Sequence, residues 1–141
     1  MQFSMLWSLL AATFLGGVIG IEREKKGSDA GLRTHVLVSL GSCLIMQVSI
    51  HVFEMYKGLA NVDPSRIAAG VITGIGFLGA GAIMRSEQSI KGLTTAASIW
   101  VSSGIGLACG CGFLGAAVFT TIITYFVLKA VRQFESRIRK K

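Results

Sequence analysis

The chain has 141 residues, of which 52% are hydrophobic and 15% are charged, and its formal net charge is +7. Soluble globular domains usually carry about 25% charged residues, so this composition excludes an ordinary soluble domain. The charges are also clustered, and long segments contain no Asp, Glu, Lys or Arg at all.

The uncharged segments cover residues 1–21, 34–53, 67–84 and 92–128. A helix needs about 20 apolar residues to cross a hydrocarbon core of about 30 Å, so each of the first three segments fits one crossing. The fourth would be about 55 Å long as a single helix, which is far too long. It is therefore predicted to form two crossings joined near Gly110, Cys111 and Gly112.

These segments predict an all-α integral membrane bundle of about five transmembrane helices. The expected spans cover residues 3–21, 35–53, 65–84, 92–109 and 112–129. A basic tail is expected over 129–141. A cleaved signal peptide begins with positive charge, whereas this chain has no Lys or Arg before Arg23. The first segment is therefore expected to remain as the first helix.

The Lys and Arg residues between the spans predict the orientation, because cytoplasmic loops are enriched in them. With five crossings, loops one and three and the tail share a side and hold twelve such residues, against two in loop two. With four crossings the division is six against eight, which gives no clear bias. The N-terminus is therefore predicted outside and the C-terminus in the cytoplasm. The positive charge then indicates no nucleic-acid partner, and the tail is either a plain anchor or a contact with anionic lipid headgroups.

Gly74, Gly76 and Gly79 spell G-x-G-x-x-G, the fingerprint of a dinucleotide-binding turn. That turn follows a strand and precedes an acidic residue about 20 positions on. Here Asp63 and Pro64 predict the start of a helix, and no acidic residue lies between 95 and 105. The fingerprint is therefore interpreted as accidental, and no cofactor is predicted.

Glycine has another use in membranes, where helices associate by close packing through small residues spaced four apart. Such rows recur in the predicted spans. The glycines assigned to helix packing are Gly16, Gly20, Gly70, Gly74, Gly76, Gly79, Gly81 and Gly106. For residues 74–81 a second interpretation stays open, in which dense glycines loosen the helix and expose its backbone to a solute.

Residues with catalytic or metal-binding chemistry are sparse. Every carboxylate lies outside the uncharged segments, whereas cation carriers usually place Asp or Glu within their spans. His51, Glu54 and Asp63 are candidates for an external cation site, although polar residues at a helix end explain them more simply. The three cysteines give an odd count and imply no disulfide framework. No catalytic set can be assembled, so the sequence predicts neither an enzyme nor a metal site.

The arginines that flank the spans are more informative, namely Arg23, Arg33, Arg66 and Arg85. If loops one and three share a face, Glu22, Arg33 and Arg85 are expected to meet there. Such a cluster is either a set of salt bridges that fixes the bundle or a binding site for phosphate or a partner's acidic group, since the Arg fork suits both.

Two long motifs carry a family resemblance. The segment "GGVIGIEREKKGSDAGLRTHVLVSLGS" resembles the first signature of the MgtC/SapB family of bacterial membrane proteins. The segments "DPSRIAAGVITGIGFLGAGAIMR" and "KGLTTAASIWVSSGIGLACGCG" resemble its second. The motif positions expected to serve interactions are Glu22, Arg23, Arg33, Thr34, Asp63, Arg66, Arg85, Thr94, Thr95 and Trp100.

The resemblance implies a multi-pass inner-membrane protein linked to growth under Mg²⁺ limitation and, in pathogens, to survival inside host cells. It implies a modulator of other membrane machinery, including membrane ATPases and membrane potential, rather than a Mg²⁺ carrier. Larger members continue into a soluble C-terminal domain, and no such domain is expected here. Thr94 stands where some members have Asn, and Val101 where some have Cys.

Two function classes remain open. The leading hypothesis is a small regulatory membrane protein that acts through helix contacts with a partner or with itself, as in a homodimer. The alternative is a small channel or transporter for Mg²⁺ or another solute. The observation that favours this alternative is the glycine-dense third span, next to the fourth span with its face of Thr and Ser residues.

Overall fold

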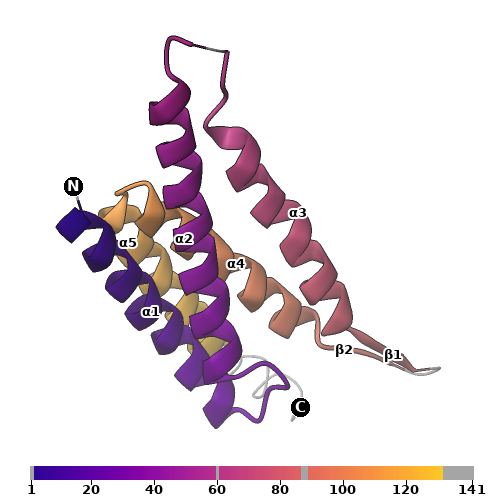
Figure 1. Ribbon diagram of the computed structural model, residues 1–141. Helices are drawn as coiled ribbons and strands as arrows, with labels where there is room; N and C mark the ends of the chain where they lie inside the picture. Colours follow the sequence, from indigo (N-terminus) through magenta and orange to yellow (C-terminus); the bar gives the residue numbers. More distant parts are fainter. Residues whose placement is uncertain (1, 60, 87–88, 132–141) are drawn as a thin grey trace.

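The computed structural model describes residues 2–59, 61–86 and 89–131 (Figure 1). In this part of the chain there are five α-helices, a π-helical turn and a two-stranded hairpin. The elements are α1 (Gln2–Lys25), α2 (Leu32–Tyr56), α3 (Ser65–Gly81), β1 (Met84–Ser86), β2 (Ser89–Lys91), α4 (Leu93–Gly110), α5 (Leu114–Phe126) and the π-helical turn η1 (Val127–Val131). Most of the predicted basic tail, residues 132–141, lies outside the described residues.

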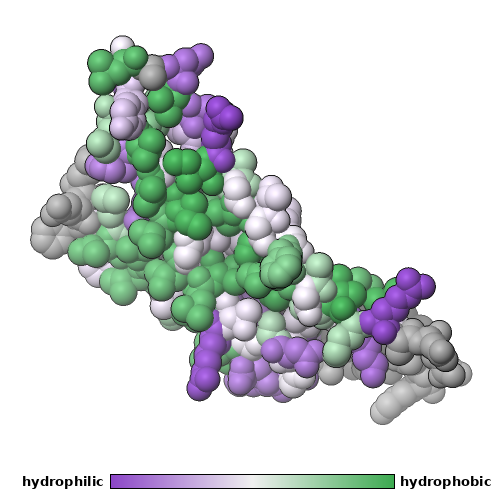
Figure 2. All heavy atoms as spheres, turned by 45° about the vertical axis from the view of Figure 1, so that its right-hand side comes forward, coloured by the Kyte–Doolittle hydropathy of each residue, from purple (hydrophilic) through white to green (hydrophobic). Residues whose placement is uncertain are grey.

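The predicted all-α membrane bundle of five helices is confirmed. Three helices, α1, α2 and α4, are long and apolar enough to cross a membrane, and α3 and α5 are shorter apolar helices. Figure 2 shows apolar side chains over the middle of one face, with hydrophilic side chains at its upper tip and along its lower edge. This distribution suits a protein whose middle lies in lipid and whose ends lie in water.

The helices form a core of three and two flanking elements (Figure 1). The most extensive contacts join α2 to α1 and to α4, while α5 packs against α1 and α4. Helix α3 lies on the other side, where it converges with α4 near the hairpin. The buried apolar residues at the centre include Ile19, Cys43, Ile105 and Cys109.

Glycines allow α1 and α4 to approach α2 very closely. A Cβ atom on Gly16 would lie 2.7 Å from the carbonyl oxygen of His35. One on Gly20 would lie 2.7 Å from the Cα of Leu32, and one on Gly106 would overlap the carbonyl oxygen of Ser39. Close backbone approach of this kind is how small residues hold membrane helices together.

The glycines of α3 behave differently. A Cβ on Gly70, Gly74, Gly76 or Gly81 would have no heavy atom of the described residues within 4 Å, whereas one on Gly79 would lie 3.7 Å from the Cβ of Ala96. Of these five predicted packing glycines, only Gly79 therefore lies at a helix contact within the described chain.

Helix α3 is continuous from Ser65 to Gly81. The interpretation of a helix loosened at residues 74–81 is therefore wrong for this conformation. The physical reason is that lipid offers no hydrogen-bond partners, so even a glycine-rich segment keeps its internal backbone bonds.

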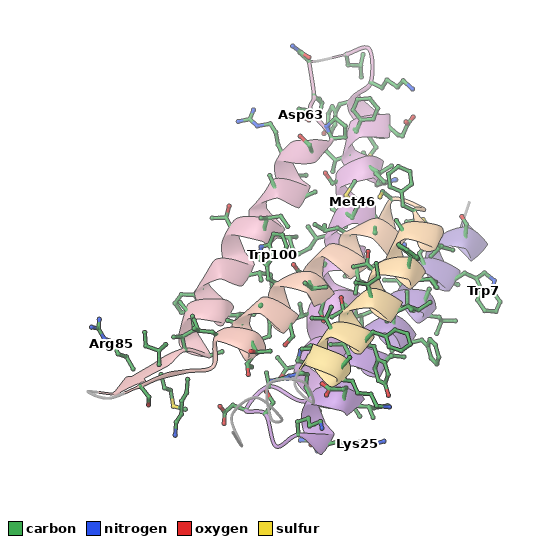
Figure 3. All side chains as sticks on the ribbon, turned by 180° about the vertical axis from the view of Figure 1, so that it is seen from behind. Trp7, Lys25, Met46, Asp63, Arg85 and Trp100 are labelled. Carbon is green, nitrogen blue, oxygen red and sulfur yellow. The ribbon has the colours of Figure 1, made fainter. Side chains whose placement is uncertain are left out.

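A short antiparallel hairpin joins α3 to α4, where the sequence had indicated only a loop. Met84 pairs with Lys91 and Arg85 with Ile90. The turn into α4 needs Gly92, whose φ is +89°, and a Cβ at this position would overlap the carbonyl oxygen of Ala82. The hairpin carries Arg85 away from the helices (Figure 3).

Candidate functional site: a buried polar cluster

Six polar side chains from three helices and a loop meet at one end of the bundle. This polar cluster consists of Glu22, Arg23, Ser28, His35, Thr95 and Ser98. It lies where α1 ends and α4 begins, at the end that also bears the hairpin (Figure 1). We call this end of the bundle the basic end, because it carries Lys25, Lys26, Arg85, Lys91 and Lys129.

Arg23 joins α1 to α4. Its guanidinium is buried in the last turn of α1, and Nη2 donates to Ser28 Oγ at 3.1 Å and to Thr95 Oγ1 at 3.3 Å. The two hydroxyl oxygens lie 2.9 Å apart and share a further hydrogen bond. The loop is also fixed to the helix, because the Ser28 backbone N–H donates to the Arg23 carbonyl oxygen. A single forked side chain thus orders the end of α1, the following loop and the start of α4.

His35 joins α2 to α4. Its ring is fully buried, with Nδ1 at 2.8 Å from the Gly31 carbonyl oxygen and Nε2 at 3.0 Å from Ser98 Oγ. A carbonyl oxygen only accepts, so Nδ1 carries a proton. The Ser98 hydroxyl, whose oxygen lies 3.0 Å from Nε2, donates to the Thr95 carbonyl oxygen at 2.8 Å. The cluster therefore contains a histidine whose orientation is set on both sides.

Glu22 is the exception in the polar cluster. The residue is only 5% exposed, and its carboxylate lies 3.9 Å from Arg23 Nη1. Neither carboxylate oxygen has a hydrogen-bond partner among the described residues, and the same holds for Arg23 Nε. Buried polar atoms are nearly always hydrogen-bonded, so these atoms indicate a place where something else can bind.

From the polar cluster, buried polar side chains continue along α2 and α4 toward the other end of the bundle. They are Gln47 and five serines, Ser39, Ser42, Ser49, Ser102 and Ser103, and we call the serines the hydroxyl seam. Gln47 Nε2 donates to the Met5 carbonyl oxygen at 2.9 Å, and the Ser49 hydroxyl donates to the Pro64 carbonyl oxygen. The hydroxyls of Ser39 and Ser102 are buried without a hydrogen-bond partner among the described residues.

The predicted meeting of Glu22, Arg33 and Arg85 is wrong. Glu22 pairs instead with its neighbour Arg23, while Arg33 and Arg85 are exposed. Figure 3 places Arg85 on the hairpin, well away from Lys25 at the end of α1. The hairpin is the physical reason, because it extends the third connection sideways rather than folding it beneath α1.

The other sequence-predicted residues lie outside the polar cluster. Thr34 is half-buried, and Asp63, Arg66 and Thr94 are exposed. Trp100 is 53% exposed on the surface of α4, so it does not wall a buried cavity.

The candidate cation site at the other end of the bundle is not assembled. Glu54 forms a salt bridge with Lys57 at 3.7 Å, and the Asp63 carboxylate accepts hydrogen bonds from Ser65. The part of the chain that the structure describes contains no group of three or more His, Cys, Asp or Glu side chains suited to a metal ion.

The sequence analysis did not predict the contact of His35 with Ser98 or the hydrogen bonds of Ser28 with Arg23 and Thr95. A signal was present in α2, where His35, Ser39, Ser42 and Ser49 recur at helical spacing in an otherwise apolar segment. Polar residues on one face of a membrane helix point toward other helices rather than lipid. The loop residue Ser28 carried no comparable signal.

The fold and its buried polar cluster define a helical integral membrane protein. The model of the MgtC family matches residues 9–137, and the chain belongs to this family. It is 46% identical over 135 residues to an Escherichia coli K12 protein named "Putative magnesium transporter YhiD", covering 94% of this chain and 63% of the relative. It is 41% identical over 141 residues to protein MgtC of Salmonella typhimurium LT2, covering 99% of this chain and 58% of the relative.

A third relative, an uncharacterized protein of Haemophilus influenzae, is 46% identical over 119 residues, which cover 82% of this chain and 50% of that protein. The chain thus spans only about half to two thirds of the length of these relatives. No solved structure matches it.

Proposed function

We propose that this protein works in the inner membrane of bacteria as a regulator in the adaptation to Mg²⁺ limitation, acting on another membrane protein or on the membrane potential. The family to which the chain belongs and the magnesium-related name of the Escherichia coli relative support the link to Mg²⁺. Regulation, rather than transport, is favoured by the interior of the bundle.

The observation that carries the proposal is the closed contact between α2 and α4. Gly106 lies so close to the Ser39 carbonyl oxygen that not even a methyl group fits between the helices. Mg²⁺ binds oxygen ligands in octahedral geometry and gives up its water reluctantly, so a pathway for it must be wide or rich in ligands. At Gly106 this interface is too narrow for such an ion.

A surface for a partner is available on α3. Gly70 and Gly74 line an open groove of about 610 Å³ between α2 and α3, together with apolar side chains such as Ile45 and Leu78. Small residues beside apolar ones are typical of sites where a second membrane helix packs. We propose that a helix of another membrane protein, such as a membrane ATPase, or of a second copy in a homodimer, binds there.

Filling the groove tests the proposal. Gly74→Ile is expected to abolish rescue of a deletion strain at low external Mg²⁺, with an unchanged amount of protein in the membrane. The matched control is Gly76→Ile, which lies on the same helix, also faces open space and does not line the groove. Equal growth of both variants would contradict the proposal.

Transport is the second candidate function, and the hydroxyl seam favours it. The hydroxyls of Ser39 and Ser102, which have no hydrogen-bond partner within the described chain, offer oxygen ligands or water sites inside the bundle. Flux of Mg²⁺ into vesicles that contain the purified protein distinguishes the two functions. A regulator gives no flux above empty vesicles, whereas a transporter gives a flux that Ser39→Ala or Ser102→Ala reduces.

A further inference from the structure

A small polar cavity of about 270 Å³ lies at the basic end, between the end of α1 and the α5–η1 segment. Its lining residues are Ile21, Glu22, Lys25, Lys26, Tyr125 and Lys129. It differs from three grooves elsewhere among the described residues, whose linings are almost entirely apolar. Three lysines, a glutamate and a tyrosine thus line one space.

Glu22 gives the cavity its chemistry. Its carboxylate is buried and finds no hydrogen-bond donor among the described residues, although the guanidinium of Arg23 lies 3.9 Å away. A buried carboxylate without donors is costly, so a ligand that brings a hydrogen-bond donor is stabilised there. An ammonium group is such a donor, and it also carries the complementary charge.

The lysines of the cavity favour a negatively charged group, whereas Glu22 favours a positively charged one. Lys25 and Lys26 follow Glu22 by about one helical turn, and Lys129 reaches the cavity from η1, with Nζ 5.5 Å from the centre of the Tyr125 ring. The π-helical turn Val127–Val131 is notable here, because such turns are rare and often mark functional sites. Lysines between membrane helices at a basic end are typical of binding sites for lipid phosphate.

Neither a bare cation nor a bare anion suits this set. A metal ion would meet three ammonium groups, and a simple phosphate would meet the buried carboxylate. A ligand with an ammonium and a phosphate a few bonds apart satisfies both. Ile21 and Tyr125 also line the cavity and offer apolar surface to the acyl part of a lipid, and Tyr is common where the membrane meets water.

We propose that the cavity binds the phosphoethanolamine headgroup of a membrane lipid. The ammonium is held by Glu22, and the phosphate is held by Lys25, Lys26 and Lys129. This site is separate from the α2–α3 groove, so it stands whether or not the proposed regulatory function is correct.

Lipid retention by the full chain in mild detergent, measured by native mass spectrometry, tests the site. The probes are phosphatidylethanolamine, phosphatidylcholine and phosphatidylglycerol with identical acyl chains, and water-soluble glycerophosphoethanolamine. The ethanolamine lipid is expected to be retained about tenfold more than the other two, because choline has no N–H to donate and phosphatidylglycerol has no ammonium. Equal retention of the three lipids, or preference for phosphatidylglycerol, would overturn the proposal. Retention of the soluble headgroup without the lipid would overturn its membrane source.

Variants separate the two halves of the site. Glu22→Gln is expected to lower retention of the ethanolamine lipid to the level of the choline lipid while leaving phosphatidylglycerol unchanged. Lys129→Gln lies at the exposed rim and is expected to weaken retention of all three. Glu54→Gln and Lys57→Gln, which exchange exposed charges at the other end of the bundle, serve as matched controls. If Glu22→Gln does not fold, Lys129→Gln alone tests the proposed site. Retention of the ethanolamine lipid at the wild-type level by that variant would overturn the proposal.

Discussion

Thr94 and Thr95 are adjacent in the sequence and have opposite environments. Thr95 is buried, receives a hydrogen bond from Arg23 and shares one with Ser28. Thr94 is exposed and lines a shallow groove between α4 and α5. Both residues could be singled out from the motif, but only the placement of the loop that carries Ser28 decides which of them is structural. That placement depends on contacts between residues 67 and 72 positions apart, which helical spacing does not reveal.

The two threonines therefore make a matched pair of substitutions. Thr95→Val keeps the shape of the side chain but removes an acceptor from the buried guanidinium, and it is expected to lower the free energy of unfolding by about 1–3 kcal/mol. Thr94→Val is expected to change it little. Denaturant or thermal unfolding in detergent measures both, and equal effects would contradict the assigned role of the polar cluster.

Two glycines of α4 provide a second pair. Gly106→Ala places a methyl group against the Ser39 backbone, so the helices must separate, at a cost of about 1–3 kcal/mol. Gly104→Ala faces open space and is expected to leave the stability unchanged or raise it by about 0.5–1 kcal/mol. Thermal unfolding of the two variants beside the wild type checks the sign of each effect.

At the scale of elements, the helices could be predicted because the length and lack of charge of each segment can be read directly in the sequence. Uncharged segments long enough to cross a membrane predicted five helices, because lipid requires each crossing segment to satisfy its own backbone. The β1–β2 hairpin could not be predicted in this way. Its pairing of Met84 with Lys91 depends on how α3 and α4 converge, and on the positive φ of Gly92. Missing the hairpin led directly to the wrong prediction for Arg85.

The start of α3 makes a prediction about pH. Ser65 donates two hydrogen bonds to the Asp63 carboxylate, from its hydroxyl at 2.7 Å and from its backbone N–H at 2.8 Å, and they lower the pKa of Asp63 below its ordinary value. A carboxyl group whose pKa is lower in the folded state stabilises that state above its unfolded pKa. This contribution is lost as the pH falls below about 4, through the lowered pKa.

The amide resonance of Ser65 reports this equilibrium. Its chemical shift in detergent is expected to titrate with a midpoint below that of an unfolded peptide of the same sequence. Asp63→Asn is the control and is expected to show no such titration. A midpoint equal to that of the peptide would show that the two hydrogen bonds do not form.

At the scale of the whole molecule, two less closely packed helices flank a core of three tightly packed ones. The contacts of α1, α2 and α4 close the interior, while α3 leaves an open groove and α5 leaves a polar cavity. Closed interiors and open edges suit a protein that works by binding lipids and other helices. The sequence predicted the small residues that make this possible, but it did not show that Gly16, Gly20 and Gly106 lie at contacts while Gly70 and Gly74 face open space.

The central claim is that successive connections lie on opposite sides of the membrane, with the basic end in the cytoplasm. Single cysteines introduced as Lys26→Cys, Lys57→Cys and Ile90→Cys, in a chain carrying Cys111→Ser, test it most directly, since the remaining Cys43 and Cys109 are buried. In intact cells, a membrane-impermeant thiol reagent is expected to label only the Lys57→Cys variant. The other two variants are expected to react only after the membrane is opened. Labelling of Lys26→Cys and Lys57→Cys from the same side would contradict the account.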